Sequence, residues 1–538
     1  GQHVVSIRST DCGRTWQPPV ALEPSDGPEA SYAVLLKTPY GRIYAFYNHN
    51  TDNMREVIAD RDAYSDGLCR RVDSLGYYVF KYSDDHGRTW SHERYPIDLR
   101  EFEIDRENAY GGKVRFFWNV GKPIMRGDEA IMVIHKVGGF GRGFFTRSEG
   151  AFFASDNILA EPDPPKIRFT TRPDGEVGLR TPPGGGPIAE EQCAVVLSDG
   201  SLFCVYRTVD GHPACSESRD GGRNWSQPRY MTYGPGGRRF KHPRAANFIW
   251  KCGNGKYLYW FHNHGGKSYE DRNPAWLCGG VECDGDGGKT IRWSQPEILL
   301  YDDDPFIRMS YPDFIEQDGR YFLTETQKHI ARVHELDSSL LEGLWAQLDG
   351  KAAPPSEALA EFVSGDESFA MPRLPAFLQR DNARADFGMR DNRAGVTFEL
   401  HVKLDSLAPG QVLFDTQKND GAGVRIEVGN DATLCVTFGD GRQTCTWVSD
   451  ANSLRAGEQQ HIAIIIDGGP KLVLMVIDGV LCDGGEQRQF GWGRFSPTMM
   501  HINGREKAQL CPVVRNARVF GRALRVAETV ASATRQAS

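Results

Sequence analysis

The chain has 538 residues, of which 40% are hydrophobic and 25% charged, with 59 glycines and 30 prolines. This length predicts more than one domain, each with a sizeable core. The net charge of −8 provides no basic field, which argues against nucleic acid and anionic membrane surfaces as partners. The longest apolar stretches, such as residues 471–477, are far shorter than the about 20 residues of a membrane helix, so we expect no membrane span.

Three copies of one pattern, Ser-x-Asp-x-Gly-x-x-Trp, occupy residues 9–16, 83–90 and 218–225, here called boxes 1, 2 and 3. In such a turn the Asp accepts backbone N–H groups, the Gly takes a positive φ, and the Trp covers the hairpin end. The pattern therefore predicts the turns of β-hairpins and not a catalytic site. Alternating apolar runs before the copies, such as residues 77–82, predict a repeated antiparallel module and hence a β-propeller.

Pairs of apolar strands joined by glycine turns predict the inner strands of this propeller. In chain order the clear pairs are 32–36 with 43–47, 194–197 with 202–206, 248–250 with 257–261, and 311–315 with 321–323. A less regular unit spans 114–153. Together with box 1 these units predict six blades, with five or seven as alternatives. We expect box 1 to complete a blade begun by C-terminal strands, because such closure removes a free sheet edge.

A second domain is predicted after the propeller. Residues 338–360 are rich in Leu, Glu and Ala and contain Ala-Pro-Pro at 353–355, which predicts a helix and then a linker. Beyond residue 366 alternating strands return without any box, which predicts an antiparallel β-sandwich. The predicted domains are 1–345, 346–365 (linker) and 366–538. Residues 471–479 and 517–524 resemble a laminin-G or concanavalin-like sandwich of the kind often attached to glycan-active enzymes.

The twelve cysteines leave two interpretations open. Cys435 and Cys445 flank a predicted hairpin turn, and Cys482 with Cys511 could staple the same domain, which would indicate an oxidising compartment. Alternatively the cysteines are reduced and serve as small buried apolar residues. No pair has zinc-site spacing, so we predict no structural zinc. We expect a secreted or periplasmic protein whose signal is not present in this chain.

The segment from Glu191 to Arg207, followed by box 3, resembles the sialidase superfamily of box-bearing propellers. In that family such a segment brings a catalytic glutamate and a carboxylate-binding arginine from adjacent strands. The resemblance extends to Arg272, at the place of a further arginine, and to residues 311–319, which supply a tyrosine nucleophile. It implies that Tyr311 attacks the anomeric carbon while Glu191 takes its proton. We expect Glu191, Arg207, Arg272 and Tyr311 to converge at the propeller axis.

The chain also departs from the family. Where an Arg-Ile-Pro motif is expected, residues 30–33 read Ala-Ser-Tyr-Ala, so one arginine of the carboxylate-binding triad is absent. The acid/base aspartate has no clear counterpart either. The loop 48–53 follows the correct strand, and His49 and Asp52 are its candidates for proton transfer, with Asn48 as a substrate ligand.

Weaker candidates lie elsewhere. His262 and His264 share one strand face, where binding of substrate hydroxyls is preferred over metal because few carboxylates are near. Arg142 in the glycine-rich stretch 138–143 could reach a substrate anion. We predict no required cofactor and no catalytic metal, although a structural Ca²⁺ ion is compatible with this fold.

These residues predict a carbohydrate-active enzyme, a sialidase-like glycoside hydrolase that acts on an acidic oligo- or polysaccharide. One alternative is a polysaccharide lyase that acts by β-elimination on a uronate-containing glycan such as a rhamnose-uronate polymer, with His49 and Tyr311 transferring protons. Another alternative is a propeller that binds glycans without catalysis.

Overall fold

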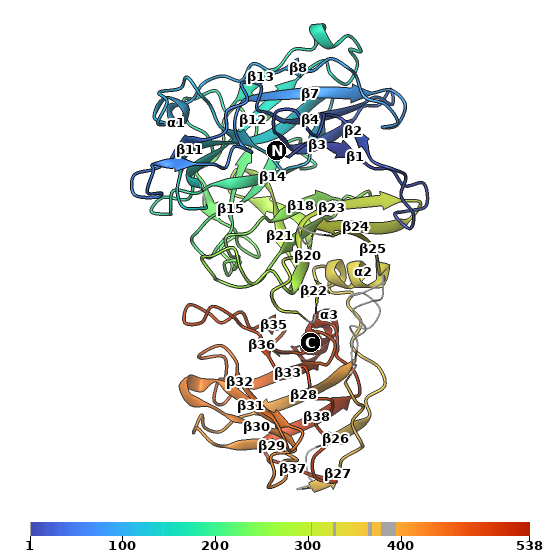
Figure 1. Ribbon diagram of the computed structural model, residues 1–538. Coiled ribbons are helices and arrows are strands. Elements are labelled where there is room, and N and C mark those ends of the chain that lie inside the picture. The colour runs from blue at the N-terminus through green and yellow to red at the C-terminus, as the bar shows by residue number, and fades with distance from the viewer. Residues whose placement is uncertain are drawn as a thin grey trace.

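The structure of the protein is a computed structural model that describes residues 2–143, 145–302, 304–326, 330–363, 368–377 and 394–537. It confirms a fold whose regular structure is mainly β-strand, with three α-helices in the described residues. Figure 1 shows two bodies, an upper one built by the N-terminal part of the chain and a lower one formed by the C-terminal sheets. The helices α2 (Ser338–Ala346) and α3 (Val526–Ala537) lie where the two bodies meet.

The upper body contains five antiparallel sheets of three to five strands. The first comprises β3 (Ala30–Lys37), β4 (Ile43–His49), β7 (Tyr77–Ser83) and β8 (Tyr95–Pro96). The second comprises β9 (Phe117–Trp118), β10 (Ile124–Arg126), β11 (Glu129–Phe140), β12 (Phe145–Ser155) and β13 (Thr170–Arg172). The third comprises β14 (Glu190–Val196), β15 (Leu202–Arg207), β16 (Ala214–Ser218) and β17 (Arg229–Tyr230).

The fourth and fifth sheets follow the same strand order. The fourth comprises β18 (Phe248–Lys251), β19 (Tyr257–Phe261), β20 (Ala275–Gly285), β21 (Gly288–Trp293) and β22 (Glu297–Leu300). The fifth comprises β23 (Ser310–Gln317), β24 (Arg320–Thr326) and β25 (Ala331–Leu336). Two short hairpins, β1 (Val5–Ser6) with β2 (Val20–Ala21) and β5 (Val57–Ile58) with β6 (Leu68–Cys69), and the helix α1 (Glu103–Arg106) complete this body.

Box 1 lies between the first and the last of these sheets. Val4 and Leu22 pack with Tyr47 of β4, whereas the Cα of Gly13 approaches Val333 of β25 so closely that an added Cβ would lie 2.6 Å from that side chain. The N-terminal segment therefore joins both ends of the row of sheets. The number of blades stays a prediction.

The three boxes form the same turn. The Gly N–H donates to the Ser Oγ at 2.8 Å in boxes 1 and 2 and at 2.7 Å in box 3, and each Gly has φ between +78° and +89°. The Trp side chains differ: Trp225 stacks on Phe152 at 4.8 Å and Trp90 packs on the first sheet, but Trp16 is 49% exposed. The turn is thus determined by the residues of the box itself, whereas burial of the Trp side chain depends on the neighbouring sheet.

The lower body consists of two packed antiparallel sheets. One comprises β26 (Ala360–Val363), β28 (Gly395–Lys403), β33 (Gln459–Asp467), β34 (Leu472–Ile477), β35 (Val480–Leu481), β36 (Gly493–Arg494) and β38 (Val514–Phe520). The other comprises β27 (Ser368–Ala370), β29 (Val412–Asp415), β30 (Gly423–Val428), β31 (Leu434–Gly439), β32 (Thr444–Val448) and β37 (Lys507–Leu510). Within the predicted linker, β26 pairs with β38.

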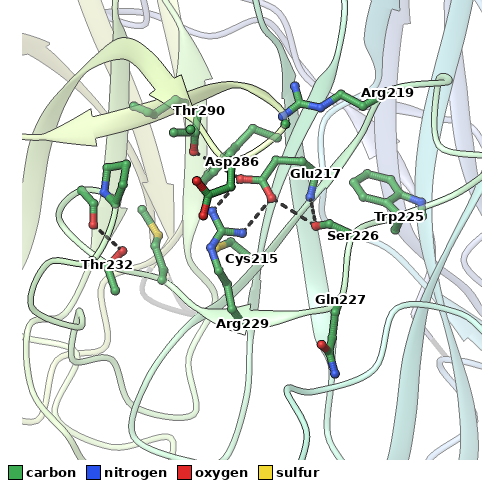
Figure 2. A pocket seen from close by; sticks show the side chains of 18 of the residues that line it. Cys215, Glu217, Arg219, Trp225, Ser226, Gln227, Arg229, Thr232, Asp286 and Thr290 are labelled. Carbon is green, nitrogen blue, oxygen red and sulfur yellow. Dashed lines mark hydrogen bonds and ion pairs between the residues drawn. The ribbon is translucent and has the colours of Figure 1, made fainter.

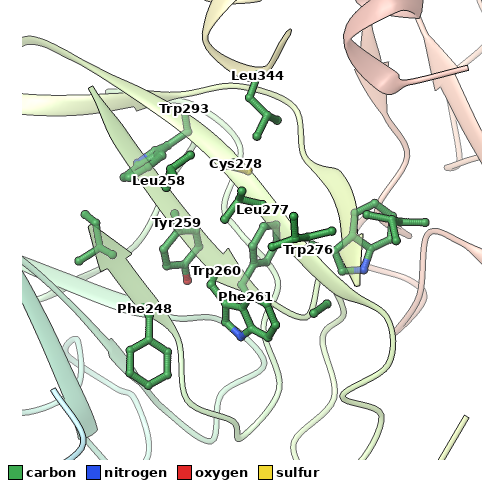
Figure 3. Close-up of a cluster of buried hydrophobic side chains, with 14 of the residues drawn as sticks. Phe248, Leu258, Tyr259, Trp260, Phe261, Trp276, Leu277, Cys278, Trp293 and Leu344 are labelled. Atoms are coloured by element: carbon green, nitrogen blue, oxygen red, sulfur yellow. The ribbon is translucent and has the colours of Figure 1, made fainter. Parts of the chain in front are cut away.

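The two bodies share one hydrophobic core. Ala463 and Ile465 of β33 join a cluster with residues of the fourth sheet, whereas Ile462 and Ile464 of the same strand face the core between the two lower sheets. Figure 3 shows part of the shared cluster, with Leu344 of α2 beside the side chains of β19 and β20. A strand that is buried on both faces reads as a continuous apolar run.

All twelve cysteines lie in the described part of the chain and none forms a disulfide. The predicted staple of Cys435 to Cys445 is wrong in register, because Cys435 lies opposite Val448 and Cys445 opposite Phe438. Cys482 is buried and Cys511 half-buried as separate thiols. The alternative of reduced cysteines that fill space therefore describes this structure, and the cysteines give no support to an oxidising compartment.

Candidate functional site

A cavity of about 790 Å³ lies where the five sheets of the upper body meet. Its lining includes Tyr32 of β3, Trp118 of β9, Phe145 of β12, Arg207 of β15 and Tyr311 of β23. Six of its described lining residues are arginines, namely Arg71, Arg142, Arg207, Arg244, Arg272 and Arg308, against one carboxylate, Asp73. Although the chain has a net charge of −8, arginines thus outnumber carboxylates in the lining of this cavity.

Irregular backbone brings the reactive side chains to the cavity. Tyr32, Glu191 and Tyr311 have φ of 59°, 56° and 49°, and each lies at a break in the register of its strand. Positive φ costs about 1 kcal/mol or more in a non-glycine residue, and bulges re-aim side chains next to active sites. Three such residues around one cavity therefore indicate a functional site.

Tyr311 and Glu191 form a hydrogen-bonded pair. The Tyr311 hydroxyl donates to Glu191 Oε1 at 3.1 Å, and Glu191 Oε2 lies 2.9 Å from Arg207 Nη1. Arg272 donates through Nη1 to Ser310 Oγ and through Nε to the Tyr269 carbonyl, both at 2.9 Å. The structure thus brings together the four residues that the sequence expects to converge.

Burial and charge set the protonation of this pair. Burial first, and then the Glu191 charge, raise the pKa of Tyr311 to about 12, while Arg272 and Arg207 oppose the rise. Tyr311 is therefore a neutral phenol near neutral pH, and its proton has an acceptor within hydrogen-bond reach. Burial also lowers the pKa of Arg272 and of Arg244 below the usual arginine range, which makes a nearby anion favourable.

His135 supports Glu191 from behind, a role that the sequence did not suggest. Its Nδ1 accepts the Glu191 backbone N–H at 3.2 Å, and its ring meets Trp118 edge-on at 4.4 Å. Complete burial holds the pKa of His135 well below its usual value, so the imidazole is neutral and can accept this bond. His135 thereby fixes the strained backbone that aims Glu191 at Tyr311.

A second tyrosine–carboxylate pair faces the same cavity. The Tyr32 hydroxyl donates to Asp73 Oδ2 at 2.6 Å, and Arg71 donates through Nε to Asp73 Oδ1 and through Nη2 to the Tyr32 hydroxyl, both at 3.0 Å. Tyr32 stands in the segment 30–33, where the sequence lacks the expected arginine. Arg71, from the connection between β4 and β7, places its guanidinium at the hydroxyl of Tyr32.

The loop after β4 does not reach the cavity with the predicted side chains. His49 is buried, with Nδ1 2.8 Å from Thr51 Oγ1 and Nε2 3.9 Å from Glu23, and burial lowers the pKa of His49 to about 4. Asp52 is exposed and accepts from the Tyr77 hydroxyl at 3.4 Å. Asn48 is buried and donates to the Phe117 carbonyl. We therefore place these three residues in the framework of the propeller.

The two predicted histidines do not share a strand face, because both follow the end of β19 at Phe261, and both are buried framework residues. His262 is fully buried and lies beside His242, with ring centroids 5.8 Å apart. His264 Nε2 lies 2.8 Å from the Asp271 carbonyl oxygen, and its ring stacks on Phe490 of the lower body at 4.8 Å. Arg142, in contrast, is exposed and lines the cavity, where the sequence expected it to reach an anion.

A second cavity, of about 640 Å³, lies beside box 3 (Figure 2). Glu217, one of three carboxylates in its lining, accepts from Arg229 at 2.6 and 2.7 Å, from Ser226 at 3.1 Å and from Thr290 at 3.2 Å. Because this carboxylate is fully engaged by protein donors, the network fastens neighbouring sheets together.

No protein-family model and no curated protein matches the chain. Among solved structures it is similar to a leech intramolecular trans-sialidase, with a TM-score of 0.42, 16% identity, and coverage of 63% of this chain and 64% of that one. It is also similar to the intramolecular trans-sialidase of Ruminococcus gnavus (TM-score 0.39, 16% identity, 60% and 82% covered). A third similar structure is a mutant Trypanosoma rangeli sialidase displaying trans-sialidase activity. It has a TM-score of 0.34 and 12% identity, with coverage of 100% of this chain and 98% of that one.

The match thus spans less than two thirds of the leech chain. These structures come from the superfamily that the sequence resembles, and at this identity and TM-score they assign no activity. Within the described ranges no group of three or more His, Cys, Asp or Glu side chains could hold a metal ion, and the possibility of a structural Ca²⁺ ion stays a prediction. No helix of the described residues is long and apolar enough to cross a membrane.

Proposed function

We propose that the protein is a glycoside hydrolase that cleaves an acidic glycan, with Tyr311 as nucleophile and Glu191 as its base. The observation that carries this proposal is the 3.1 Å hydrogen bond from the Tyr311 hydroxyl to Glu191, inside a cavity lined by arginines. A neutral phenol is a suitable nucleophile beside an anionic sugar, since it carries no charge that repels the substrate.

In the first step the Tyr311 oxygen forms a bond to the anomeric carbon as its proton passes to Glu191. Arg207 and Arg272 stabilise the negative charge that develops on the phenol oxygen, since both favour its ionised form. The glycosidic C–O bond breaks, and the leaving oxygen takes a proton from a general acid. Water then attacks the anomeric carbon of the glycosyl-tyrosine while the same group takes up the water proton, the bond from the Tyr311 oxygen to that carbon breaks, and Glu191 returns its proton to the phenol oxygen.

Asp73 is the group we assign to this proton transfer. Among the described residues that line the cavity it is the only carboxylate, and the sequence candidates His49 and Asp52 lie elsewhere. Tyr32 and Arg71 hold its two oxygens by hydrogen bonds of 2.6 and 3.0 Å. The sugar and the linkage are not specified by this assignment.

The test combines product analysis with variants of the pair. A panel of acidic oligosaccharides is incubated with the protein, and products are identified by mass spectrometry. Tyr311→Phe and Glu191→Gln should each lower kcat at least ~100-fold, and the double variant should be little worse than either, because the two side chains act as one unit.

Tyr257→Phe is the matched control, since Tyr257 donates to Glu282 at 2.5 Å outside the cavity and its loss should leave kcat within about 2-fold. Near-normal turnover in Tyr311→Phe would refute the nucleophile. An ultraviolet-absorbing unsaturated uronate among the products would instead support the lyase alternative. Binding of glycans without any product would support the non-catalytic alternative.

A further inference from the structure

The six arginines of the cavity fall into two groups. The Tyr311 group consists of Arg207, Arg272 and Arg308, which gather around Tyr311 and Tyr269; Arg308 lies 4.6 Å over the Tyr269 ring. The Phe145 group consists of Arg71, Arg142 and Arg244, which surround the start of β12. One carboxylate clamp needs two or three guanidinium groups, so a single anionic group does not account for both sets.

Phe145 organises the second group. The Arg71 guanidinium lies 4.5 Å over its ring, and Arg244 Nη2 donates to its carbonyl oxygen at 2.9 Å. Arg142 precedes it on the same loop with an exposed side chain. The ring and the carbonyl of one residue thus hold two guanidinium groups on the same wall of the cavity.

The charges near the Phe145 group favour an added anion. Glu190 is shared, because Arg207 binds it through Nε at 3.0 Å while Arg244 lies 3.7 Å from it. Asp73 is the carboxylate of Arg71. Arg71 and Arg244 thus each have one carboxylate within reach, and Arg207 also pairs with Glu191 at 2.9 Å. The three arginines of the Phe145 group still outnumber the carboxylates beside them, and a ligand anion would offset that excess of positive charge.

The size of the cavity agrees with more than one sugar unit. Its volume of about 790 Å³ lies in the upper part of the roughly 300–1,000 Å³ range of ligand pockets.

We propose that the substrate carries anionic groups on two adjacent sugar units, one bound by the Tyr311 group and the other, a carboxylate or a sulfate, bound by the Phe145 group. This inference rests on the proposed function and extends it from one acidic sugar to a glycan with consecutive charges. Planar guanidinium groups bind either anion through paired N–H donors, so the geometry leaves the choice to experiment.

Binding is measured by calorimetry in the Tyr311→Phe protein, which keeps the arginines and stops turnover. The probes are three disaccharides that share a non-reducing-end hexuronate and end in glucose, glucuronate or glucose 6-sulfate. The two dianionic probes, or one of them, should bind about 10-fold more tightly than the monoanionic probe, the usual effect of one good charge-assisted contact. Whichever dianion is preferred identifies the second group as carboxylate or sulfate.

Arg244→Gln and Arg142→Gln should each remove most of this preference while leaving affinity for the monoanionic probe within about 2-fold. Arg142 is exposed, so its variant avoids a failure to fold. Arg147→Gln is the matched control, because Arg147 lies on β12, the strand that begins at Phe145, but pairs with Glu107 at 3.0 Å. This variant should keep the full preference for the dianionic probes.

Equal binding of the three probes, or a preference that survives both variants, would overturn the second subsite and leave the proposed function standing. If none of the three probes binds, the second subsite is refuted as well, whereas the proposed function is decided separately by the product panel and the Tyr311→Phe variant. The two failures are therefore distinguishable.

Discussion

The cavity contains two tyrosine–carboxylate–arginine sets that are alike in parts and different in construction. Tyr311, Glu191 and Arg207 all stand on strands of the sheets, whereas Tyr32 stands on a strand and receives Asp73 and Arg71 from a loop. Both tyrosines have positive φ and both have a pKa raised by burial. The strand-built set suits a nucleophile, which needs a fixed angle of attack, and the loop-built set suits a proton carrier that serves two steps.

Replacement of Asp73 by Asn gives the largest effect that tests this comparison. If Asp73 protonates the leaving oxygen, kcat/KM on a natural glycan should fall ~100-fold, but by less than about 5-fold on an aryl glycoside whose leaving group needs no acid. The measurement is initial rate on the two substrates. Asp52→Asn should change neither rate by more than about 2-fold. If Asp52→Asn lowers the rate on the natural glycan and Asp73→Asn does not, Asp52 is the general acid instead.

Tyr32→Phe should have a smaller effect. The change removes the 2.6 Å hydrogen bond to Asp73 and leaves the Arg71 contact, so we expect kcat to fall ~10-fold with KM little altered. Steady-state kinetics of Tyr32→Phe and Tyr311→Phe, measured together, would show whether the two tyrosines contribute differently to kcat. Equal losses in the two variants would mean that either tyrosine could be the nucleophile.

His49→Gln should have the smallest effect on turnover, less than about 3-fold in kcat, because His49 contacts Thr51 and Glu23 rather than the cavity. Its effect should appear in stability. The pKa of His49 is lowered to about 4 in the fold, so the stability it contributes is present above its unfolded pKa of 6.5 and is lost as pH falls from 6.5 through 4.

Thermal unfolding between pH 7 and pH 4 measures this effect. The variant should lose less stability than the parent on acidification. A large loss of kcat in His49→Gln, with unchanged unfolding, would contradict its place in the framework and revive its role in proton transfer.

Much of the fold follows from local sequence. The boxes specify their own turns, because Ser, Asp and Gly of one box bond to each other, and alternating strands such as β30 bury every second residue. The register of Cys435 and Cys445 was not predictable in this way, since it depends on how β31 meets β32. Likewise, nothing within the apolar run of β33 reveals that its two faces enter different cores.

The strand-built part of the site was predictable, whereas the loop-built part was not. Glu191, Arg207 and Tyr311 stand beside recognisable strand and turn patterns. Asp73, Arg71 and Arg244 are single residues in irregular segments, and only their three-dimensional neighbours give them a role. The one signal for Asp73 and Arg71 is the long connection between β4 and β7, because insertions of that length in compact domains are often functional.

The two faces of strand β33 enter two different clusters and so join the C-terminal sheets to the upper body, which bears on how such chains change. A module attached by a linker can be gained, lost or exchanged between proteins without compensating substitutions in the rest of the chain. Here removal would bare Trp276 and Leu344, which pack in one cluster with Ile465 and Trp492, and would leave a large apolar patch on the fourth sheet. The upper and lower bodies therefore depend on each other for burial of this cluster, and loss of the C-terminal sheets should destabilise the fourth sheet.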